Sequence, residues 1–501
     1  MRKVNWAGAL TGIVLFFFCS ATLHAADLRK AREDALSAAV GIEKELNLMS
    51  DKLWTYAELA MEEFRSTKVL TDYLVKNGFK VERNVAGMPT AFVATWGSGA
   101  PVIGFNVECD ALPGISQKAT VTKDPVVEGA PGHGCGHNYL GVGSIGAAVA
   151  MKSSMEKNGI KGTLKLFGNP GEELCIGKPY FAEAGIYKDV DAFLDWHPVG
   201  NNAASAASCN AYFNVRYRFY GKTGHGNVPW TARSALDAAI LQANMVEFLR
   251  EHIRAGDASA ATTINYSFTQ VGPSYPNVIS DYTEAWYVGR LPSDEVLQDT
   301  VRRITLAAEA AAKATETRME MKWLSATHIR IPNITLAKLI DKNLRTVGPP
   351  KFTKEEHDFA KGVQKAIGEK EVGLDEAIGP VSVGWGAVSD TSEMSWFAPW
   401  ASVITATRGV GNMSHNWSTV AFGNTSIAKK GYMLAVKTLA LTGLDILHNP
   451  DILKEAKAEW VERMAGRTHK PLYPAGNPVP VDVNKAEMEK YRKLMEKFYL
   501  E

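Results

Sequence analysis

The chain has 501 residues, of which 46% are hydrophobic and 22% are charged, and its formal net charge is +1. One hydrophobic core does not support a chain of this length, so two or more domains are expected. The near-neutral charge gives no indication of binding to nucleic acid or to an anionic membrane surface.

Residues 1–26 have the pattern of a secretory signal peptide. Arg2 and Lys3 precede an apolar run over 9–19, and small residues follow up to Ala26. This order is typical of a cleaved signal, and the run is too short to span a bilayer as a mature helix. The pattern predicts an exported protein, periplasmic or secreted, without membrane contact after the signal is removed. An uncleaved membrane anchor is the alternative.

The segment 27–210 predicts alternating helices and strands, and therefore an α/β domain with a central sheet flanked by helices. Helices are expected over 27–80 and 139–157, and strands over 88–94, 102–107, 163–168 and 191–196. Polar residues follow three of these strands, namely Asp110, the pair Glu172 and Glu173, and His197. Ligands in open α/β sheets bind beyond the carboxyl ends of the strands, so these side chains are candidates for a common site.

The loop 129–138 contains four glycines, two histidines and one cysteine. Glycine permits tight backbone conformations, so Cys135 and His137 can turn toward one point. A thiolate and an imidazole are donors that a metal ion prefers. The loop therefore predicts a metal site, and a glycine-rich turn with incidental polar residues is the alternative.

Residues 211–327 have a different order of strands and helices, which predicts a second domain inserted into the first. Strands are expected over 211–220, 262–271, 282–288 and 318–326, and helices over 234–253 and 295–314. This βαββαβ order is that of a ferredoxin-like unit.

The first pattern resumes over 328–446, with helices expected over 336–347 and 427–441 and strands over 381–385 and 401–406. His415 lies in the polar loop after the last strand. Residues 447–501 are charged and predict a C-terminal helical extension without a chemical role.

Four clusters distant in the sequence could converge on two divalent metal ions. Cys135 is the natural bridge, because a thiolate can bind both ions. The predicted ligands are His137 and His197 for one ion and Glu173 and His415 for the other. Glu172, adjacent to a ligand, is predicted to stay free as the general base. Asp110 is predicted to orient an imidazole such as that of His137.

Several stretches of the sequence match motifs of a known family, and they follow one another in the same order as in that family. They are 108–117, 132–138, 170–173, 196–198, 221–226, and Ser395-Trp396 with His415. On these residues the chain resembles the aminoacylase/carboxypeptidase superfamily, metallopeptidase family 20. Within it, the chain is similar to a branch of p-aminobenzoyl-glutamate hydrolases. Glu393 departs from the branch, which usually has Asp at that position.

The resemblance implies a dinuclear amidohydrolase with an inserted dimerisation lid, and it supports the five ligands and Glu172. It implies that His225 of the lid reaches into the site of the partner subunit and stabilises the oxyanion, a contribution commonly of ~3 kcal/mol. It implies that Asn277 and Arg290 hold the substrate carboxylate, to which arginine binds in bidentate fashion. The chain is therefore expected to form a homodimer through the lid.

The expected reaction is hydrolysis of the amide bond of an N-acyl or N-aroyl amino acid by a metal-bound hydroxide, with Glu172 carrying the proton. Sulfur at the bridge favours zinc, and the resemblance also implies manganese. A dipeptidase or exopeptidase on the same scaffold is one alternative. A periplasmic binding protein without turnover is another, although binding alone has no use for a free base beside Glu173.

Overall fold

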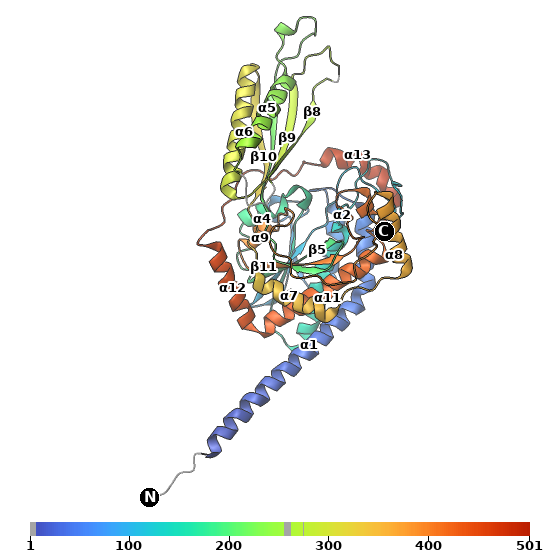
Figure 1. Ribbon diagram of the computed structural model, residues 1–501, viewed down its shortest axis with the longest axis vertical. Helices are drawn as coiled ribbons and strands as arrows, with labels where there is room; N and C mark the ends of the chain where they lie inside the picture. The colour runs from blue at the N-terminus through green and yellow to red at the C-terminus, as the bar shows by residue number, and fades with distance from the viewer. Residues whose placement is uncertain (1–6, 255–261, 274) are drawn as a thin grey trace.

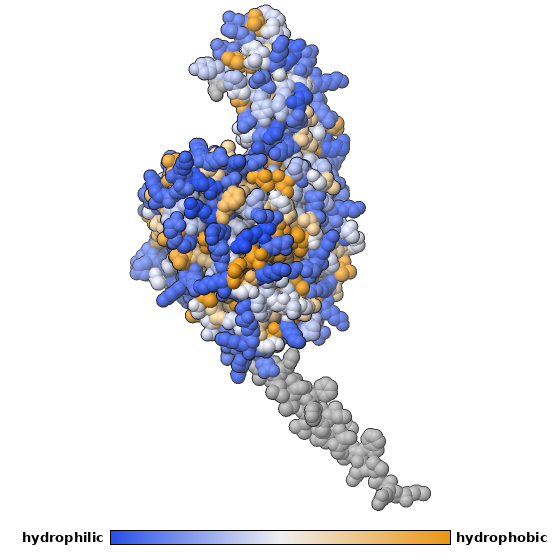
Figure 2. Space-filling view, turned by 180° about the vertical axis from the view of Figure 1, so that it is seen from behind, coloured by the Kyte–Doolittle hydropathy of each residue, from blue (hydrophilic) through white to orange (hydrophobic). Residues whose placement is uncertain are grey.

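The computed structural model describes the backbone of residues 7–254, 262–273 and 275–501, and the side chains from residue 27 onward. The predicted signal peptide, residues 1–26, therefore lies outside the described side chains. A large α/β domain carries a second, narrower domain that projects from it (Figure 1). The face of the projecting domain that is turned away from the viewer in Figure 1 is mostly hydrophilic (Figure 2). Among the described residues, no helix combines the length and the apolarity that crossing a bilayer requires.

A sheet of seven strands forms the centre of the large domain, in the order β1-β2-β4-β3-β5-β11-β6. The strands are β1 (Lys80–Arg83), β2 (Phe92–Ser98), β3 (Val102–Val107), β4 (Gly162–Gly168), β5 (Ala192–Val199), β6 (Ala203–Ser205) and β11 (Trp400–Ala406). The four strands β4, β3, β5 and β11 are parallel, and the outer pairs are antiparallel. The carboxyl ends of the parallel strands therefore share one edge, where the predicted site residues gather.

Alternate residues of the central strands enter two different cores. Leu194 and Trp196 of β5 pack in one cluster with α1 (Ala7–Tyr56), α3 (His137–Asn158), α7 (Ile334–Val347) and α11 (Ser426–His448). Phe193 packs in another with α4 (Gly177–Glu183) and α9 (Ser392–Ser395). Because successive side chains of a strand point to opposite faces, helices cover both faces of the sheet. The remaining helices of this domain are α2 (Phe64–Lys76), α8 (Lys354–Ala366) and α10 (Trp417–Val420).

The projecting domain, called the lid here, has the predicted βαββαβ order. Its elements are β7 (Ala211–Tyr220), α5 (Ala235–Leu249), β8 (Thr263–Val271), β9 (Tyr282–Leu291), α6 (Asp294–Ala314) and β10 (Arg318–Thr327). The four strands form an antiparallel sheet in the order β10-β7-β9-β8. The hydroxyls of Ser234 and Ser293 cap the amino ends of α5 and α6. The two-domain α/β fold predicted from the sequence is thus confirmed.

The C-terminal extension is helical only in part, over α12 (Pro450–Met464) and α13 (Lys485–Met495). The segment between them, residues 465–484, is called the C-terminal strap here, and it runs along the base of the lid (Figure 1). His469 Nε2 lies 2.6 Å from Glu393 Oε2 of the large domain. Asn477 donates its side-chain amide to the carbonyl oxygen of Trp323 in β10 at 3.2 Å. The strap therefore bonds to both domains.

Two further expectations were wrong. The helix expected over 27–80 is broken, because Ala57 has a φ of 38° and Glu58 turns back to accept the backbone N–H of Ser66 at 2.8 Å. Residues 381–385 form only isolated bridges, through Ser382 and Trp385, and not a strand. Val383 is 61% exposed and has no core to enter, and Gly384 has a φ of 95°, which interrupts an extended backbone.

Candidate metal centre

The loop 129–138, called the metal loop here, leads into α3 and places Cys135 and His137 at its amino end. A Cβ on Gly134 would meet Ile115 Cδ1 at 2.4 Å and His415 Cα at 3.3 Å. The backbone N–H of His415 donates to the carbonyl oxygen of Gly134 at 2.8 Å. The missing side chain at residue 134 therefore lets the loop after β11 lie directly against the metal loop.

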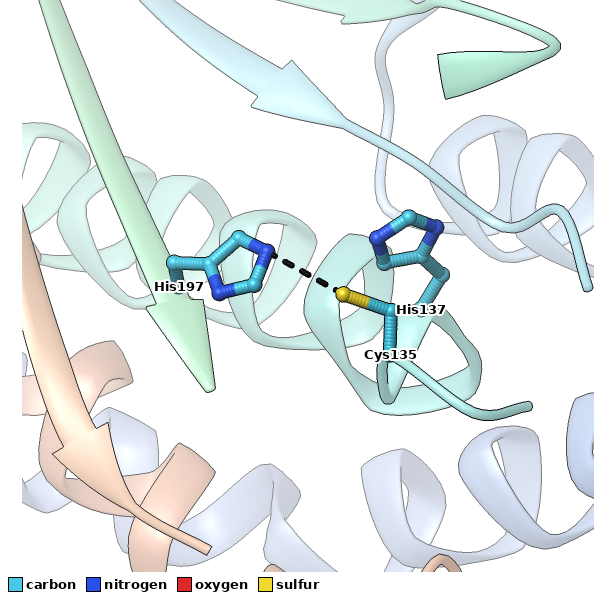
Figure 3. A group of neighbouring side chains, drawn as sticks. All are labelled: Cys135, His137 and His197. Carbon is cyan, nitrogen blue, oxygen red and sulfur yellow. Dashed lines mark hydrogen bonds between the residues drawn. The ribbon is translucent and has the colours of Figure 1, made fainter. Parts of the chain in front are cut away.

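Cys135, His137 and His197 form the first group of candidate ligands, with donor atoms within 4.8 Å of one another (Figure 3). Cys135 Sγ lies 3.5 Å from His197 Nε2, and His197 Nδ1 lies 3.1 Å from the carbonyl oxygen of Pro198. His137 Nδ1 lies 2.9 Å from Asp110 Oδ1, and its buried Nε2 has no hydrogen-bond partner among the described residues. Each imidazole is fixed through one nitrogen and presents the other, as metal-binding histidines do.

Cys135, Glu173 and His415 form the second group, again with donor atoms within 4.8 Å of one another. His415 Nε2 lies 3.2 Å from Glu173 Oε2, and the buried Glu173 Oε1 finds no hydrogen-bond partner in the part of the chain that the structure describes. His415 has a φ of 66°, a conformation that costs free energy in a non-glycine residue and that its hydrogen bond to the metal loop helps to hold. Cys135 is therefore common to both groups, as expected of a bridge.

Asp110 connects the two groups. Its Oδ1 faces His137, and its Oδ2 accepts the backbone N–H of Glu173 at 2.9 Å. Through this contact Asp110 is placed to orient the His137 ring, a role that stays a prediction. The structure also places His197 inside β5 and not after its end, so its position is set by the sheet itself.

Burial opposes charge on these donors. It raises the pKa of the Cys135 thiol to about 11, raises the pKa of Glu173 well above its ordinary value, and lowers the pKa of His197 to about 3. Ionised thiolate and carboxylate groups in this place require added positive charge. Divalent ions would supply it, and sulfur, nitrogen and carboxylate donors are those that zinc binds in proteins. The unpartnered His137 Nε2 and Glu173 Oε1 fit the same interpretation.

Glu172 lies beside this centre, with Oε2 3.8 Å from His137 Nε2. Burial, and after it the charge of Glu108, raises the pKa of Glu172 to about 7. A carboxyl group with a pKa near neutrality is well suited to take up and release a proton. The adjacent glutamates therefore have different surroundings, because Glu173 groups with Cys135 and Glu172 groups with Glu108 and His137.

The prediction from sequence missed a buried ion network next to the centre. Lys178 Nζ lies 2.7 Å from Glu108 Oε1 and 2.5 Å from Asp390 Oδ1, and all three side chains are at most 1% exposed. The available signal was the spacing of Glu108 and Asp110 at the end of β3, since residues two apart on an extended chain share a face. Lys178 and Asp390 carry no such signal.

The residues assigned to the lid by resemblance lie outside both donor groups. His225 is exposed and its backbone pairs with Val278, while the carbonyl oxygen of Asn277 accepts the N–H of Gly226 at 2.7 Å. His225 and Asn277 therefore lie together on the lid. Arg290 lies on β9, near enough to the centre that its charge contributes, after burial and the charge of His137, to a lowered pKa of His415.

Several known proteins are similar to this chain. A family profile described as "Peptidase dimerisation domain" matches residues 205–316, which include most of the lid. The B component of the p-aminobenzoyl-glutamate hydrolase of Escherichia coli K12 is 34% identical over 441 residues, covering 82% of this chain and 91% of that protein. The Xaa-Arg dipeptidase of Mus musculus is 26% identical over 458 residues, covering 88% of this chain and 94% of that protein.

A solved structure has the same fold. It is a Bacillus subtilis protein described as a dinuclear metal-binding peptidase from the M20 family, with a TM-score of 0.50 and 19% identity, and the match covers 81% of this chain and 98% of that chain.

The four cysteines with described side chains, Cys109, Cys135, Cys175 and Cys209, are all buried and free of disulfides. Cys135 is therefore available to a metal ion.

Proposed function

Because this chain belongs to the M20 peptidase family, we propose that it hydrolyses the amide bond of N-acyl or N-aroyl amino acids, with p-aminobenzoyl-glutamate as the first substrate to test. Family membership makes it a metal-dependent hydrolase of amide bonds. The substrate and the roles of single residues are what we propose. The observation that carries the proposal is the pair of donor groups that share Cys135.

In this proposal, Cys135 would contribute to the binding of both divalent ions, His137 and His197 would hold one of them, and Glu173 and His415 would hold the other. When bound, the ions polarise the scissile carbonyl group and lower the pKa of a water molecule. Zinc is the first candidate, because sulfur and nitrogen donors favour it, and manganese is the second.

Glu172 acts as the general base. It takes a proton from the water that attacks the carbonyl carbon, and it gives that proton to the amide nitrogen as the carbon–nitrogen bond breaks. The products are a carboxylic acid and a free amino acid. The partner subunit's His225 would donate a hydrogen bond to the oxyanion. Arg290 and Asn277 would hold the substrate carboxylate, which selects an amino acid on the leaving side.

The decisive experiment combines metal analysis with a substrate panel. The purified protein is expected to contain two ions per chain and to release p-aminobenzoate from p-aminobenzoyl-glutamate. Metal content without hydrolysis of any amide would overturn the proposal in favour of a binding protein. The second candidate function is a dipeptidase, favoured by the identity to the Xaa-Arg dipeptidase, and preferential cleavage of dipeptides with a C-terminal arginine would establish it.

Subunit mixing tests the homodimer and the role of His225. We expect His225→Ala and Glu172→Gln homodimers each to be inactive. Random mixing of equal amounts makes about half of the dimers heterodimers. Each heterodimer contains one site with an intact Glu172 and an intact histidine from the other subunit, so about a quarter of the wild-type activity should return. Absence of any recovery in verified heterodimers would show that His225 does not act across the interface.

We also propose export of the protein, on the pattern of residues 1–26. Mass spectrometry of the protein from a periplasmic fraction should find an amino terminus near Ala26. An intact Met1 in the membrane fraction would indicate the uncleaved anchor instead.

A further inference from the structure

We propose that the Glu108 carboxylate is a sixth donor of the metal centre and binds the ion that His137 holds. The inference rests on the proposed function in one respect, namely that the centre binds two divalent ions. Glu108 follows β3 directly and is 1% exposed. One carboxylate oxygen of Glu108, one of Glu172 and a ring nitrogen of His137 lie within 4.8 Å of one another.

The two oxygens of Glu108 have different surroundings. Oε1 lies within hydrogen-bond distance of two donors, Lys178 Nζ at 2.7 Å and Asn106 Nδ2 at 2.7 Å. Oε2 lies on the side of His137, 3.5 Å from its Nε2. The carboxylate is therefore fixed through one oxygen and presents the other toward the centre.

The contact between Glu108 Oε2 and His137 Nε2 is not a hydrogen bond, because 3.5 Å is well beyond the usual N–H···O distance. His137 Nδ1 already faces Asp110, so Nε2 presents a lone pair to the carboxylate oxygen when the ring is neutral. Two lone pairs facing each other in a buried place repel unless a proton or a metal ion lies between them, and 3.5 Å is longer than the distance that a shared proton gives. Two ligands of one tetrahedral zinc ion, each ~2.0–2.1 Å from it, are ~3.3 Å apart, which is close to this separation.

Lys178 and Asp390 explain how Glu108 stays charged and oriented. The Lys178 ammonium lies between the carboxylates of Glu108 and Asp390. The backbone N–H of Lys178 donates to Asp390 Oδ2 at 3.3 Å. A buried ion is costly unless it is paired and hydrogen-bonded, and this network satisfies Oε1 of Glu108 completely. Lys178 is therefore a positioning residue that holds Glu108 with Oε2 toward the metal centre.

The test compares Glu108→Gln with a matched control, Asp195→Asn. Glutamine keeps one oxygen for Lys178 and Asn106 and places an amide nitrogen, which has no lone pair to offer, where Oε2 stands. Asp195 is also buried and also accepts from Asn106, at 3.2 Å, and it belongs to no donor group among the described residues. Zinc affinities are measured by competition with a chromophoric chelator.

We expect Glu108→Gln to weaken the binding of one of the two zinc ions by at least about tenfold, and Asp195→Asn to leave both affinities unchanged. Two ions bound by Glu108→Gln with wild-type affinity would overturn the inference and leave the proposed function intact. A wild-type protein without metal would instead overturn the proposed function itself.

A crystal structure of the zinc-loaded wild-type protein needs no variant and decides the matter even if Glu108→Gln does not fold. Anomalous scattering locates each ion. We expect Glu108 Oε2 at ~2.0–2.2 Å from the ion bound by His137 Nε2. A distance beyond ~3 Å would overturn the inference.

Discussion

Glu393 joins three parts of the molecule at the base of the lid, and the effect of replacing it can be worked out from its contacts. Its Oε1 accepts from the backbone N–H of His328 at 2.7 Å and lies 2.8 Å from His328 Nδ1, directly after β10. Its Oε2 lies 2.6 Å from His469 Nε2 of the C-terminal strap. These separations are those of charged hydrogen bonds and are too short for an ion between the atoms.

Glu393→Gln should loosen the strap. Glutamine keeps an oxygen for the two His328 groups, but its amide nitrogen cannot accept from His469. One charge-assisted hydrogen bond is lost, which lowers the free energy of local opening by about 1.5–3 kcal/mol. Opening should become roughly ten- to a hundredfold more frequent, since each ~1.4 kcal/mol is a factor of ten.

Hydrogen–deuterium exchange at pH 6, followed by mass spectrometry, measures this opening in peptides from residues 465–484. His469→Ala should give the same acceleration, and the double variant should exchange little faster than either single one, because both remove the same contact. The exposed Glu371 provides the control variant Glu371→Gln. Unchanged protection of the strap in Glu393→Gln would refute the reasoning.

The effect should also depend on pH. Burial alone would raise the pKa of Glu393 and lower that of His328, but their mutual attraction holds the pKa of Glu393 below and that of His328 above its ordinary value. The stability that the Glu393 carboxylate contributes is present above about pH 4.3 and is lost as the pH falls through its lowered pKa. The stability that the His328 imidazolium contributes is present below about pH 6.5 and is lost as the pH rises through its raised pKa. Wild type and Glu393→Gln should therefore differ most between about pH 4.3 and 6.5. A difference that stays constant up to pH 10 would contradict this assignment.

Three further predictions concern the metal centre. Glu172→Gln should retain two ions but lower kcat for p-aminobenzoyl-glutamate by roughly 10²–10⁴-fold, and an active variant would remove Glu172 as the base. Cys135→Ser should weaken the binding of both ions in titration calorimetry, whereas His415→Ala should weaken only one; equal losses would argue against the bridge. Gly134→Ala, whose Cβ would lie 3.3 Å from His415 Cα, should shift the loop after β11 and lower the unfolding free energy by about 1 kcal/mol. The control Gly379→Ala, with no atom nearer than 3.6 Å, should leave thermal unfolding unchanged.

The features that sequence could predict are those with local patterns. The βαββαβ order of the lid follows from strand and helix periodicity, and Cys135 and His137 are found because they lie two residues apart among glycines. Lys178 and Asp390 are 212 residues apart and meet only after the sheet has formed. Nothing local distinguishes Lys178 from a solvated lysine on a helix, so the network that holds Glu108 could not be foreseen.

Two other differences have the same kind of cause. Val381 and Val383 alternate as in a strand, but alternation predicts a strand only when one face has a core to enter, and Val383 is 61% exposed. The C-terminal strap lacks periodicity altogether. Its contacts with β10 and Glu393 come from single side chains such as Asn477 and His469, which no repeating pattern announces.

Residues 328–331 connect β10 of the lid to the large domain, and the C-terminal strap bonds beside them to Glu393 on one side and to β10 on the other, so that a swing of the lid would displace the strap. The Trp396 ring lies against His328 there, with ring centroids 4.2 Å apart, and its indole N–H donates to the carbonyl oxygen of Ile329 at 2.8 Å. Displacement of the lid would move His328 away from the Trp396 indole and change the fluorescence of Trp396. Because the chain contains 12 tryptophans, the signal of Trp396 is obtained as the difference in intrinsic fluorescence between the wild type and Trp396→Phe.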